Sequence, residues 1–261
     1  MIFHTLRKSH PAPFASFIRR KNDVVISASP ERFFKVESGK EKGEGRKAKG
    51  EGRFISVSPI KGTRPRGKDS AEDFLLRNEL LNSEKDRAEN VMIVDLLRND
   101  IGKICEYGTV EVEKLCDLEE HSTLFHLVST VLGKLRPNLQ FSEILRATFP
   151  CGSITGAPKI RTMKIIDQLE TASRGLSMGA IGFRIGDWGL GIDSEKLILH
   201  SPLSTFHSYD LSVAIRTMTI RGREAIFNVG GGIVIDSDPN SEYEETLTKA
   251  KAILTAIRSE K

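Results

Sequence analysis

Apolar positions recur along the chain with two periods, which predict a mixture of strands and helices. Short apolar runs, several of them ended by proline or glycine, predict strands at residues 24–29, 33–36, 54–58, 110–115, 177–185, 211–220 and 223–235. Apolar stripes at three- and four-residue spacing predict helices at residues 69–81, 84–104, 141–148, 159–173 and 241–258. Residues 124–135 are rich in β-forming residues but remain ambiguous.

The predicted strands outnumber the long helices, and several of them pair as hairpins. The clearest hairpin joins residues 213–220 to residues 224–229 through Arg-Gly-Arg at residues 221–223. This order favours an α+β fold, with antiparallel sheets flanked by helices, over a doubly wound parallel sheet. Because no repeat or Pro/Ser-rich linker marks a boundary, we expect one domain over residues 1–261.

Composition narrows the class of protein. The 261 residues are 39% hydrophobic and 28% charged, which excludes a disordered, collagen-like or coiled-coil chain. No apolar run approaches the roughly 20 residues that cross a bilayer, so no membrane partner is expected. The start lacks the apolar segment of a secretion signal, and the three cysteines form no Cys-x-x-Cys pair. A reduced, cytoplasmic protein is therefore expected.

The net charge of +4 is concentrated in part at residues 40–53, where basic residues outnumber acidic ones among several glycines. A nucleic-acid-binding arm and a solvated loop between strands both fit this composition. We favour the loop, because no aromatic residue is available to stack on bases and the glutamates repel phosphate. No nucleic-acid partner is expected.

Two predicted helices carry pairs of carboxylates three residues apart: Asp86 and Glu89 on one, Glu242 and Glu245 on the other. Residues at this spacing share one face of a helix. Two such faces turned toward each other offer oxygen ligands to Mg²⁺. Spacing alone favours exposed helix charges over a metal site, with Glu245 and Lys249 as a surface ion pair.

Two glycine-containing stretches and one arginine are candidate anion-binding groups. The glycines at residues 230–232 allow close approach of backbone N–H groups to an anion, and they also fit an irregular strand. Residues 152–159 form a loop that opens onto a predicted helix, but they lack the signature of a P-loop. Arg216, within a predicted apolar strand, requires a partner, which is either a ligand carboxylate or a structural acid.

Lys61 and His126 are candidates for chemistry at the substrate. Lys61 belongs to a turn-rich stretch, Pro-Ile-Lys-Gly-Thr-Arg-Pro-Arg at residues 59–66. It is either an exposed lysine or a nucleophile held by a tight turn. His126 lies in an apolar run, where a histidine with a structural role is the commoner case.

Taken together, these stretches resemble the chorismate-utilising enzymes, which include anthranilate synthase component I, aminodeoxychorismate synthase component I, and the isochorismate and salicylate synthases. The matching segments follow the family order between about residues 11 and 258. They are residues 29–33, 59–66, 88–100, 126–129, 153–159, 215–217 and 230–249. The ordered set is specific although each segment alone is weak, and it implies the antiparallel fold of anthranilate synthase component I.

Within the family, the Pro-Ile-Lys-Gly-Thr form resembles the aminodeoxychorismate synthases, since anthranilate synthases usually have alanine at the position of Lys61. The resemblance implies amination of chorismate to 4-amino-4-deoxychorismate, for 4-aminobenzoate and folate synthesis. It also implies a separate glutamine amidotransferase subunit that supplies ammonia. Anthranilate synthase component I and a non-catalytic chorismate-binding fragment or subunit remain alternatives.

The resemblance also implies roles for individual residues. Lys61 corresponds to the nucleophile and Glu31 to the general acid. Glu89 and Glu245 correspond to the Mg²⁺ ligands, with Asp86 and Glu242 as neighbours that act directly or through water. The implied substrate-binding residues are His126, Ser153, Ile154, Thr155, Gly156, Arg216, Gly230, Gly232 and Lys249.

The chain departs from the family pattern at several places. Family members usually carry well over a hundred further N-terminal residues, so the chain is expected to lack the usual N-terminal region. Phe183 stands where tyrosine is common, and Asn90 where histidine is frequent. Residues 188–209 form a longer connection than the family pattern predicts, and no function is assigned to this insertion.

Overall fold

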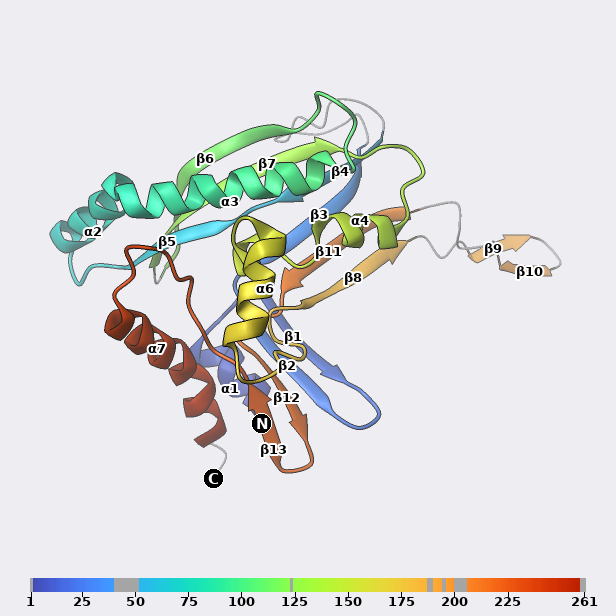
Figure 1. Cartoon of the computed structure of the whole chain (residues 1–261). Coiled ribbons are helices and arrows are strands. Elements are labelled where there is room, and N and C mark those ends of the chain that lie inside the picture. Colours follow the sequence, from blue (N-terminus) through green and yellow to red (C-terminus); the bar gives the residue numbers. More distant parts are fainter. Residues whose placement is uncertain are drawn as a thin grey trace. The chain divides into compact units, whose positions relative to one another are not determined.

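The computed structural model describes residues 2–39, 52–122, 124–186, 190–193, 196–199 and 206–258 (Figure 1). The basic loop expected at residues 40–53 therefore lies almost wholly outside the described residues, as does much of the insertion at 188–209. The chain divides into two compact units. Unit 1 comprises Met1–Phe33, Phe149–Ile181 and Ser212–Lys261, and unit 2 comprises Phe34–Thr148 and Gly182–Leu211.

Unit 1 is built on a four-stranded antiparallel sheet with the strand order β1-β2-β12-β13. Its strands are β1 (Phe14–Arg19), β2 (Val24–Ser29), β12 (Thr217–Arg221) and β13 (Glu224–Phe227). Its helices are α1 (Ile2–Ser9), α5 (Gly152–Thr155), α6 (Lys159–Leu169) and α7 (Pro239–Arg258). The core joins the sheet to α1 and α7, because Leu6, Ile26, Met218, Ile253 and Ala256 pack in one cluster.

Unit 2 contains most of a seven-stranded sheet with the order β5-β7-β4-β3-β11-β8, in which β6 also pairs with β7. The strands are β3 (Arg32–Gly39), β4 (Gly52–Val57), β5 (Ile60–Pro65), β6 (Glu111–Glu120), β7 (Leu124–Lys134), β8 (Ala180–Gly186) and β11 (Phe206–Val213). A separate hairpin consists of β9 (Leu190–Asp193) and β10 (Lys196–Leu199). The helices are α2 (Ser70–Asn82), α3 (Glu84–Gly102) and α4 (Phe141–Thr148).

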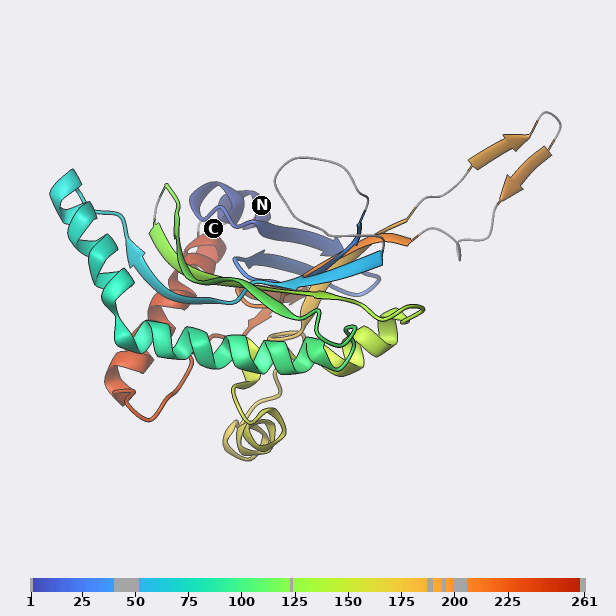
Figure 2. The same ribbon diagram turned by 90° about the horizontal axis from the view of Figure 1, so that it is seen from above.

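Helix α3 runs along one face of the sheet and contacts the strands β5, β6 and β7 (Figure 2). It buries residues at helical spacing, among them Ile93, Val94, Leu97 and Ile101, and this spacing explains why the segment forms a helix against the sheet. A second cluster, formed by Leu80, Phe125 and Leu127, attaches the end of α2 to β7. No helix in the described ranges is both long and apolar enough to cross a membrane.

The predicted α+β class with antiparallel sheets is confirmed, and the ambiguous residues 124–135 form strand β7. Several boundaries were wrong. The predicted strand at 211–220 is interrupted between β11 and β12, the strand expected to reach residue 235 ends at Phe227, and the helix expected to reach residue 173 ends at Leu169. Strands β1 and β5 and helix α1 were not predicted.

A buried polar network attaches α3 to the sheet. Asn90 is fully buried, and its side-chain amide donates to the carbonyl of Leu127 at 3.2 Å. The Ser129 hydroxyl donates to Asn90 Oδ1 and accepts from the backbone N–H of Cys116 at 2.8 Å. Every polar group in this chain of contacts has a partner, which is the condition for burying them.

Replacement of Asn90 by alanine is expected to lower the free energy of unfolding by about 2–3 kcal/mol, because buried groups of Leu127 and Ser129 lose their partners. The matched control is Asn82→Ala on exposed α2, where a cost under about 0.5 kcal/mol is expected. Urea unfolding of both variants measures the difference. Equal midpoints for the two variants would contradict the assignment.

Candidate functional site

The predicted nucleophile Lys61 lies in an irregular part of strand β5 and not in a free turn as the sequence suggested. Ile60 pairs with Val128 and Thr63 pairs with His126, so the register shifts between these two pairs. Such a bulge redirects the side chains of the extra residues relative to the regular strand. Lys61 is half-buried, and it has no hydrogen bond or ion pair within the described part of the chain.

Gly62, beside Lys61, brings the backbone of β5 against helix α3. It has φ +81°, a conformation that side-chain-bearing residues rarely adopt. A Cβ atom at this position would lie 2.9 Å from both Asp86 Cβ and Leu80 Cδ1. Glycine therefore allows the strand that carries Lys61 to approach the helix that carries Asp86, and sequence reasoning did not assign it this role.

Replacement of Gly62 by alanine is expected to lower the free energy of unfolding by about 2–4 kcal/mol, since the change adds backbone strain to an atomic overlap. Gly108→Ala is the matched control, because Gly108 has φ +76° but open space around it. Gly108→Ala should lower the free energy of unfolding by only about 1 kcal/mol. Thermal and urea unfolding of the two variants measure the difference. Equal losses of stability would show that the close approach of Gly62 to α3 is unimportant.

The carboxylates Asp86 and Glu89 lie on the first turns of α3. Ser83 caps the helix and accepts the backbone N–H of Asp86 at 3.2 Å. Asp86 Oδ2 accepts from Arg64 Nη2 at 3.2 Å. Glu89 is half-buried and has no ion pair or hydrogen bond with any described residue, so its carboxylate is available to a cation.

His126 projects from β7 beside the same bulge. Its Nδ1 lies 2.9 Å from the hydroxyl of Thr63, the residue opposite it on β5. Its ring also meets the ring of His121 edge-on, with centroids 5.5 Å apart. The contact with Thr63 fixes the orientation of the ring.

In unit 1, Glu31 follows strand β2 and has only 8% of its surface exposed. Its backbone N–H donates to Ser29 Oγ at 3.3 Å, and its carbonyl accepts from Val213 at 3.1 Å. Burial, together with the charge of Glu31, raises the pKa of the Cys151 thiol to about 12. The side chain of Glu31 is therefore largely shielded from water.

Residues 152–155, predicted as a loop, form the single-turn helix α5, which ends at Gly156 with φ +78°. The Ser153 hydroxyl lies 3.2 Å from Cys151 Sγ. Thr155 is buried and donates to the Cys151 carbonyl at 3.4 Å, whereas Ile154 is half-buried. The predicted substrate-binding residues of this segment are thus held by hydrogen bonds to the chain just before them.

Arg216 lies at the break between β11 and β12, where the sequence predicted a continuous strand. Its φ of +48° turns the chain, and its carbonyl accepts from Ala28 at 3.0 Å. The residue as a whole is exposed. Neighbouring protein atoms nevertheless desolvate its guanidinium group, and this desolvation lowers the pKa of Arg216. No described residue forms an ion pair or side-chain hydrogen bond with it, so an anionic ligand is the partner that its chemistry favours.

The glycine segment 230–232 lies against the start of α7. Lys249 Nζ donates to the Gly230 carbonyl at 3.3 Å and pairs with Glu245 Oε1 at 2.7 Å. Glu242 accepts from the Ser237 hydroxyl at 2.6 Å, and a Cβ at residue 231 would lie 3.0 Å from Glu242 Oε2. Gly230, Glu242, Glu245 and Lys249 are therefore neighbours, whereas no contact of Gly232 tests its predicted role.

The predicted site residues form one set in each unit. Unit 2 carries Lys61, Asp86, Glu89 and His126, and unit 1 carries the remaining ones. Within the described residues, no three His, Cys, Asp or Glu side chains form a metal-binding group. Each of α3 and α7 nevertheless presents two carboxylates three residues apart, an all-oxygen donor set that fits Mg²⁺. The sequence reasoning missed three neighbours of these residues: Thr63, Arg64 and Ser237.

Comparison with known proteins decides the family. The profile of the chorismate binding enzymes matches residues 1–187 and 203–255, which is most of the chain. The chain belongs to this family of chorismate-utilising enzymes. The resemblance inferred from the ordered motifs is thereby confirmed.

Relatives in the family carry two different names. The chain is 42% identical over 257 residues to aminodeoxychorismate synthase component 1 of Klebsiella aerogenes, covering 98% of this chain and 50% of the relative. It is 38% identical over 256 residues to anthranilate synthase component 1 of Aquifex aeolicus, covering 98% and 45%. The chain thus spans about half the length of these relatives.

A solved structure supports the fold assignment. Anthranilate synthase component I of Streptococcus pneumoniae matches with a TM-score of 0.73 and 34% identity, covering 97% of this chain and 48% of that one. The predicted likeness to the fold of anthranilate synthase component I is confirmed.

Proposed function

We propose that the chain aminates chorismate with ammonia to give 4-amino-4-deoxychorismate, which leads to 4-aminobenzoate and folate. The observation that carries this proposal is Lys61 in the bulge of β5, a half-buried amine without a partner among the described residues. Relatives named aminodeoxychorismate synthase, at 40–42% identity over nearly the whole chain, support it.

The proposed reaction proceeds through an adduct with Lys61. The amine of Lys61 attacks C2 of chorismate, the ring double bonds shift, and the C4 hydroxyl leaves as water with a proton from Glu31. Ammonia then attacks C4, the double bonds shift back, and the bond between Lys61 and C2 breaks. One ammonia is consumed and one water is released, and the lysine is regenerated.

Binding of the substrate rests on charge. Chorismate carries two carboxylates, and Arg216 and Lys249 are the cationic side chains proposed to hold them, with backbone groups at Gly230 and Gly232. The proposed ligands of Mg²⁺ are Glu89 and Glu245, assisted by Asp86 and Glu242. When bound, Mg²⁺ supplies positive charge for the ring carboxylate and makes the ring more electrophilic.

The proposed pocket residues complete the site. Ser153, Ile154, Thr155 and Gly156 are proposed to line it, and His126 is proposed to lie near the ring. A glutamine amidotransferase subunit is proposed as the partner that supplies ammonia. Ammonium salts should therefore replace glutamine and this subunit in vitro.

Formation of anthranilate, the 2-amino product, is the second candidate. The observation that favours it is the relative named anthranilate synthase component 1, whose 38% identity is close to that of the other group. The two reactions share every proposed site residue except the Lys61 adduct. They are therefore separated by their products and not by binding.

One assay tests both candidates. The purified chain is incubated with chorismate, Mg²⁺ and an ammonium salt at alkaline pH, and the products are resolved by mass. A 4-amino product supports the proposal, and anthranilate supports the second candidate. Chorismate binding without any turnover would instead identify a non-catalytic binding subunit.

A further inference from the structure

Arg64 joins three elements of unit 2 at one point. It lies on β5, three residues after Lys61, and only a quarter of its side chain is exposed. Its Nε donates to Glu79 Oε1 of α2 at 2.8 Å, and its Nη2 donates to Asp86 Oδ2 of α3 at 3.2 Å. A third nitrogen, Nη1, donates to the Thr63 carbonyl of its own strand at 3.0 Å.

This arrangement uses the geometry that distinguishes arginine from lysine. The planar guanidinium presents several N–H groups in a fixed fork, so a single side chain binds two carboxylates in defined directions. Burial alone would lower the pKa of Arg64, but hydrogen bonding to Glu79 and the charge of Asp86 outweigh burial and raise it. The positive charge is therefore permanent, and Asp86 is held by one oxygen.

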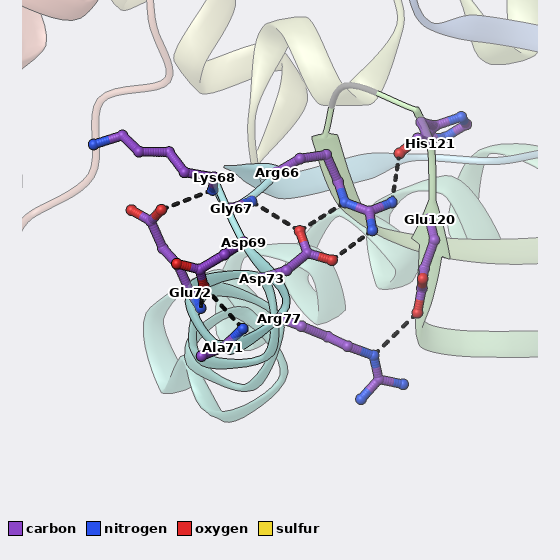
Figure 3. A network of polar contacts seen from close by, with 10 residues as sticks. All are labelled: Arg66, Gly67, Lys68, Asp69, Ala71, Glu72, Asp73, Arg77, Glu120 and His121. Atoms are coloured by element: carbon purple, nitrogen blue, oxygen red, sulfur yellow. Dashed lines mark hydrogen bonds and ion pairs between the residues drawn. The ribbon is translucent and has the colours of Figure 1, made fainter.

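A second arginine, Arg66, follows the end of β5 and serves as a structural comparison. Arg66 pairs with Asp73 through two nitrogens, at 2.8 and 2.5 Å, and donates to the His121 carbonyl at 3.0 Å (Figure 3). It fixes the start of α2, where the Gly67 N–H also donates to Asp73 at 2.8 Å. Within the described ranges, Arg66 forms no hydrogen bond or ion pair with a carboxylate of α3.

We propose that Arg64 is a positioning residue, which holds Asp86 of α3 against the Gly62 bulge and so fixes Lys61 relative to the carboxylates of α3. The close approach of the Gly62 backbone to Asp86 and the ion pair of Arg64 with Asp86 are two separate observations that place the same strand against the same side chain. The inference rests on the proposed function for its catalytic consequence.

The test compares Arg64→Ala, Arg64→Lys and the matched control Arg66→Ala. Calorimetry measures Mg²⁺ affinity in the presence of chorismate, and steady-state assays give kcat and KM. Arg64→Ala should weaken Mg²⁺ binding about tenfold and lower kcat at saturating Mg²⁺ about tenfold, because loss of an outer partner loosens a ligand-bearing segment. The KM for chorismate should change little. Arg64→Lys should recover part of both losses, since it keeps the charge but not the fork.

Arg66→Ala should reduce thermal stability while leaving Mg²⁺ affinity and kcat near those of the parent. An Arg64→Ala variant with parental Mg²⁺ affinity, with tighter Mg²⁺ binding, or with losses matched by Arg66→Ala would overturn the proposal. Hydrogen exchange at residues 60–64 and 84–89 supplies a readout that needs no activity. Exchange there should rise in Arg64→Ala and not in Arg66→Ala.

These measurements distinguish failure of the proposed function from failure of the positioning role of Arg64. If the parent chain neither binds Mg²⁺ with chorismate nor turns chorismate over, the proposed function fails, and hydrogen exchange still decides whether Arg64 holds β5 to α3. If the parent is active and the Arg64 variants behave like the parent, the positioning role fails and the proposed function stands.

Discussion

Replacement of Lys61 by alanine is expected to reduce formation of 4-amino-4-deoxychorismate about a thousandfold or more. Without the amine the adduct cannot form, and removal of a nucleophile takes away the whole covalent route. Binding should survive, because the proposed carboxylate and metal contacts do not involve Lys61. Direct addition of ammonia at C2 is then open, so anthranilate is the product to look for.

The measurement is product formation by mass, combined with intact-protein mass spectrometry during turnover. A lysine adduct should appear in the parent and be absent from Lys61→Ala. Lys68→Ala is the matched control, since Lys68 is an exposed residue just beyond β5 whose described hydrogen bond is made by its backbone. A Lys61→Ala variant as fast as the parent, with the same product and no adduct in either, would eliminate the nucleophile assignment.

The sequence correctly predicted the elements in which apolar residues follow a single clear pattern. Helix α3 was found because its apolar residues recur every three or four positions, and β2 because its apolar run stops before Pro30. Strand β5 was missed because Pro59, Gly62 and Pro65 punctuate it as a turn would. Its identity as a strand comes from pairing with β7, which is information from the tertiary structure.

At Arg216 the error is the opposite one, because a strand was predicted where the chain is interrupted. Residues 211–220 are apolar enough to predict one continuous strand, but the chain turns at φ +48° between β11 and β12. A positive φ at a residue other than glycine leaves no signal in the apolar pattern. The same turn leaves the Arg216 side chain without an acidic partner in the described residues, which the pattern could not predict either.

The candidate site residues come from the ordered motifs, whereas the contacts that support them were not predicted. Asp86 and Glu89 share a face because helical spacing requires it. That Arg64 binds Asp86, and that Thr63 contacts His126, depends on how α3 and β7 meet β5 in three dimensions. Motif residues with no assigned chemistry, such as the Gly-Thr-Arg after Lys61, were the available signal for these neighbours.

Replacement of Glu89 by glutamine is expected to weaken Mg²⁺ binding in the presence of chorismate by more than about a hundredfold. The loss of an outer partner costs about 10–100-fold, and a direct ligand should cost more. Among the carboxylates of α3, Glu89 is the better candidate for a direct ligand. It has no partner among the described residues, whereas Asp86 already binds Arg64. The amide keeps the size of the side chain and removes only its charge.

Calorimetric titration with Mg²⁺ and chorismate measures this effect, and unfolding in urea shows whether the fold is kept. Glu84→Gln is the matched control, because Glu84 is an exposed carboxylate at the start of the same helix. Glu84→Gln should bind Mg²⁺ with an affinity within about twofold of that of the parent, since exposed charges at a distance are screened. If Glu89→Gln and Glu84→Gln bind Mg²⁺ equally well, the acidic face of α3 is a solvated helix surface, and the metal must be sought on α7 alone.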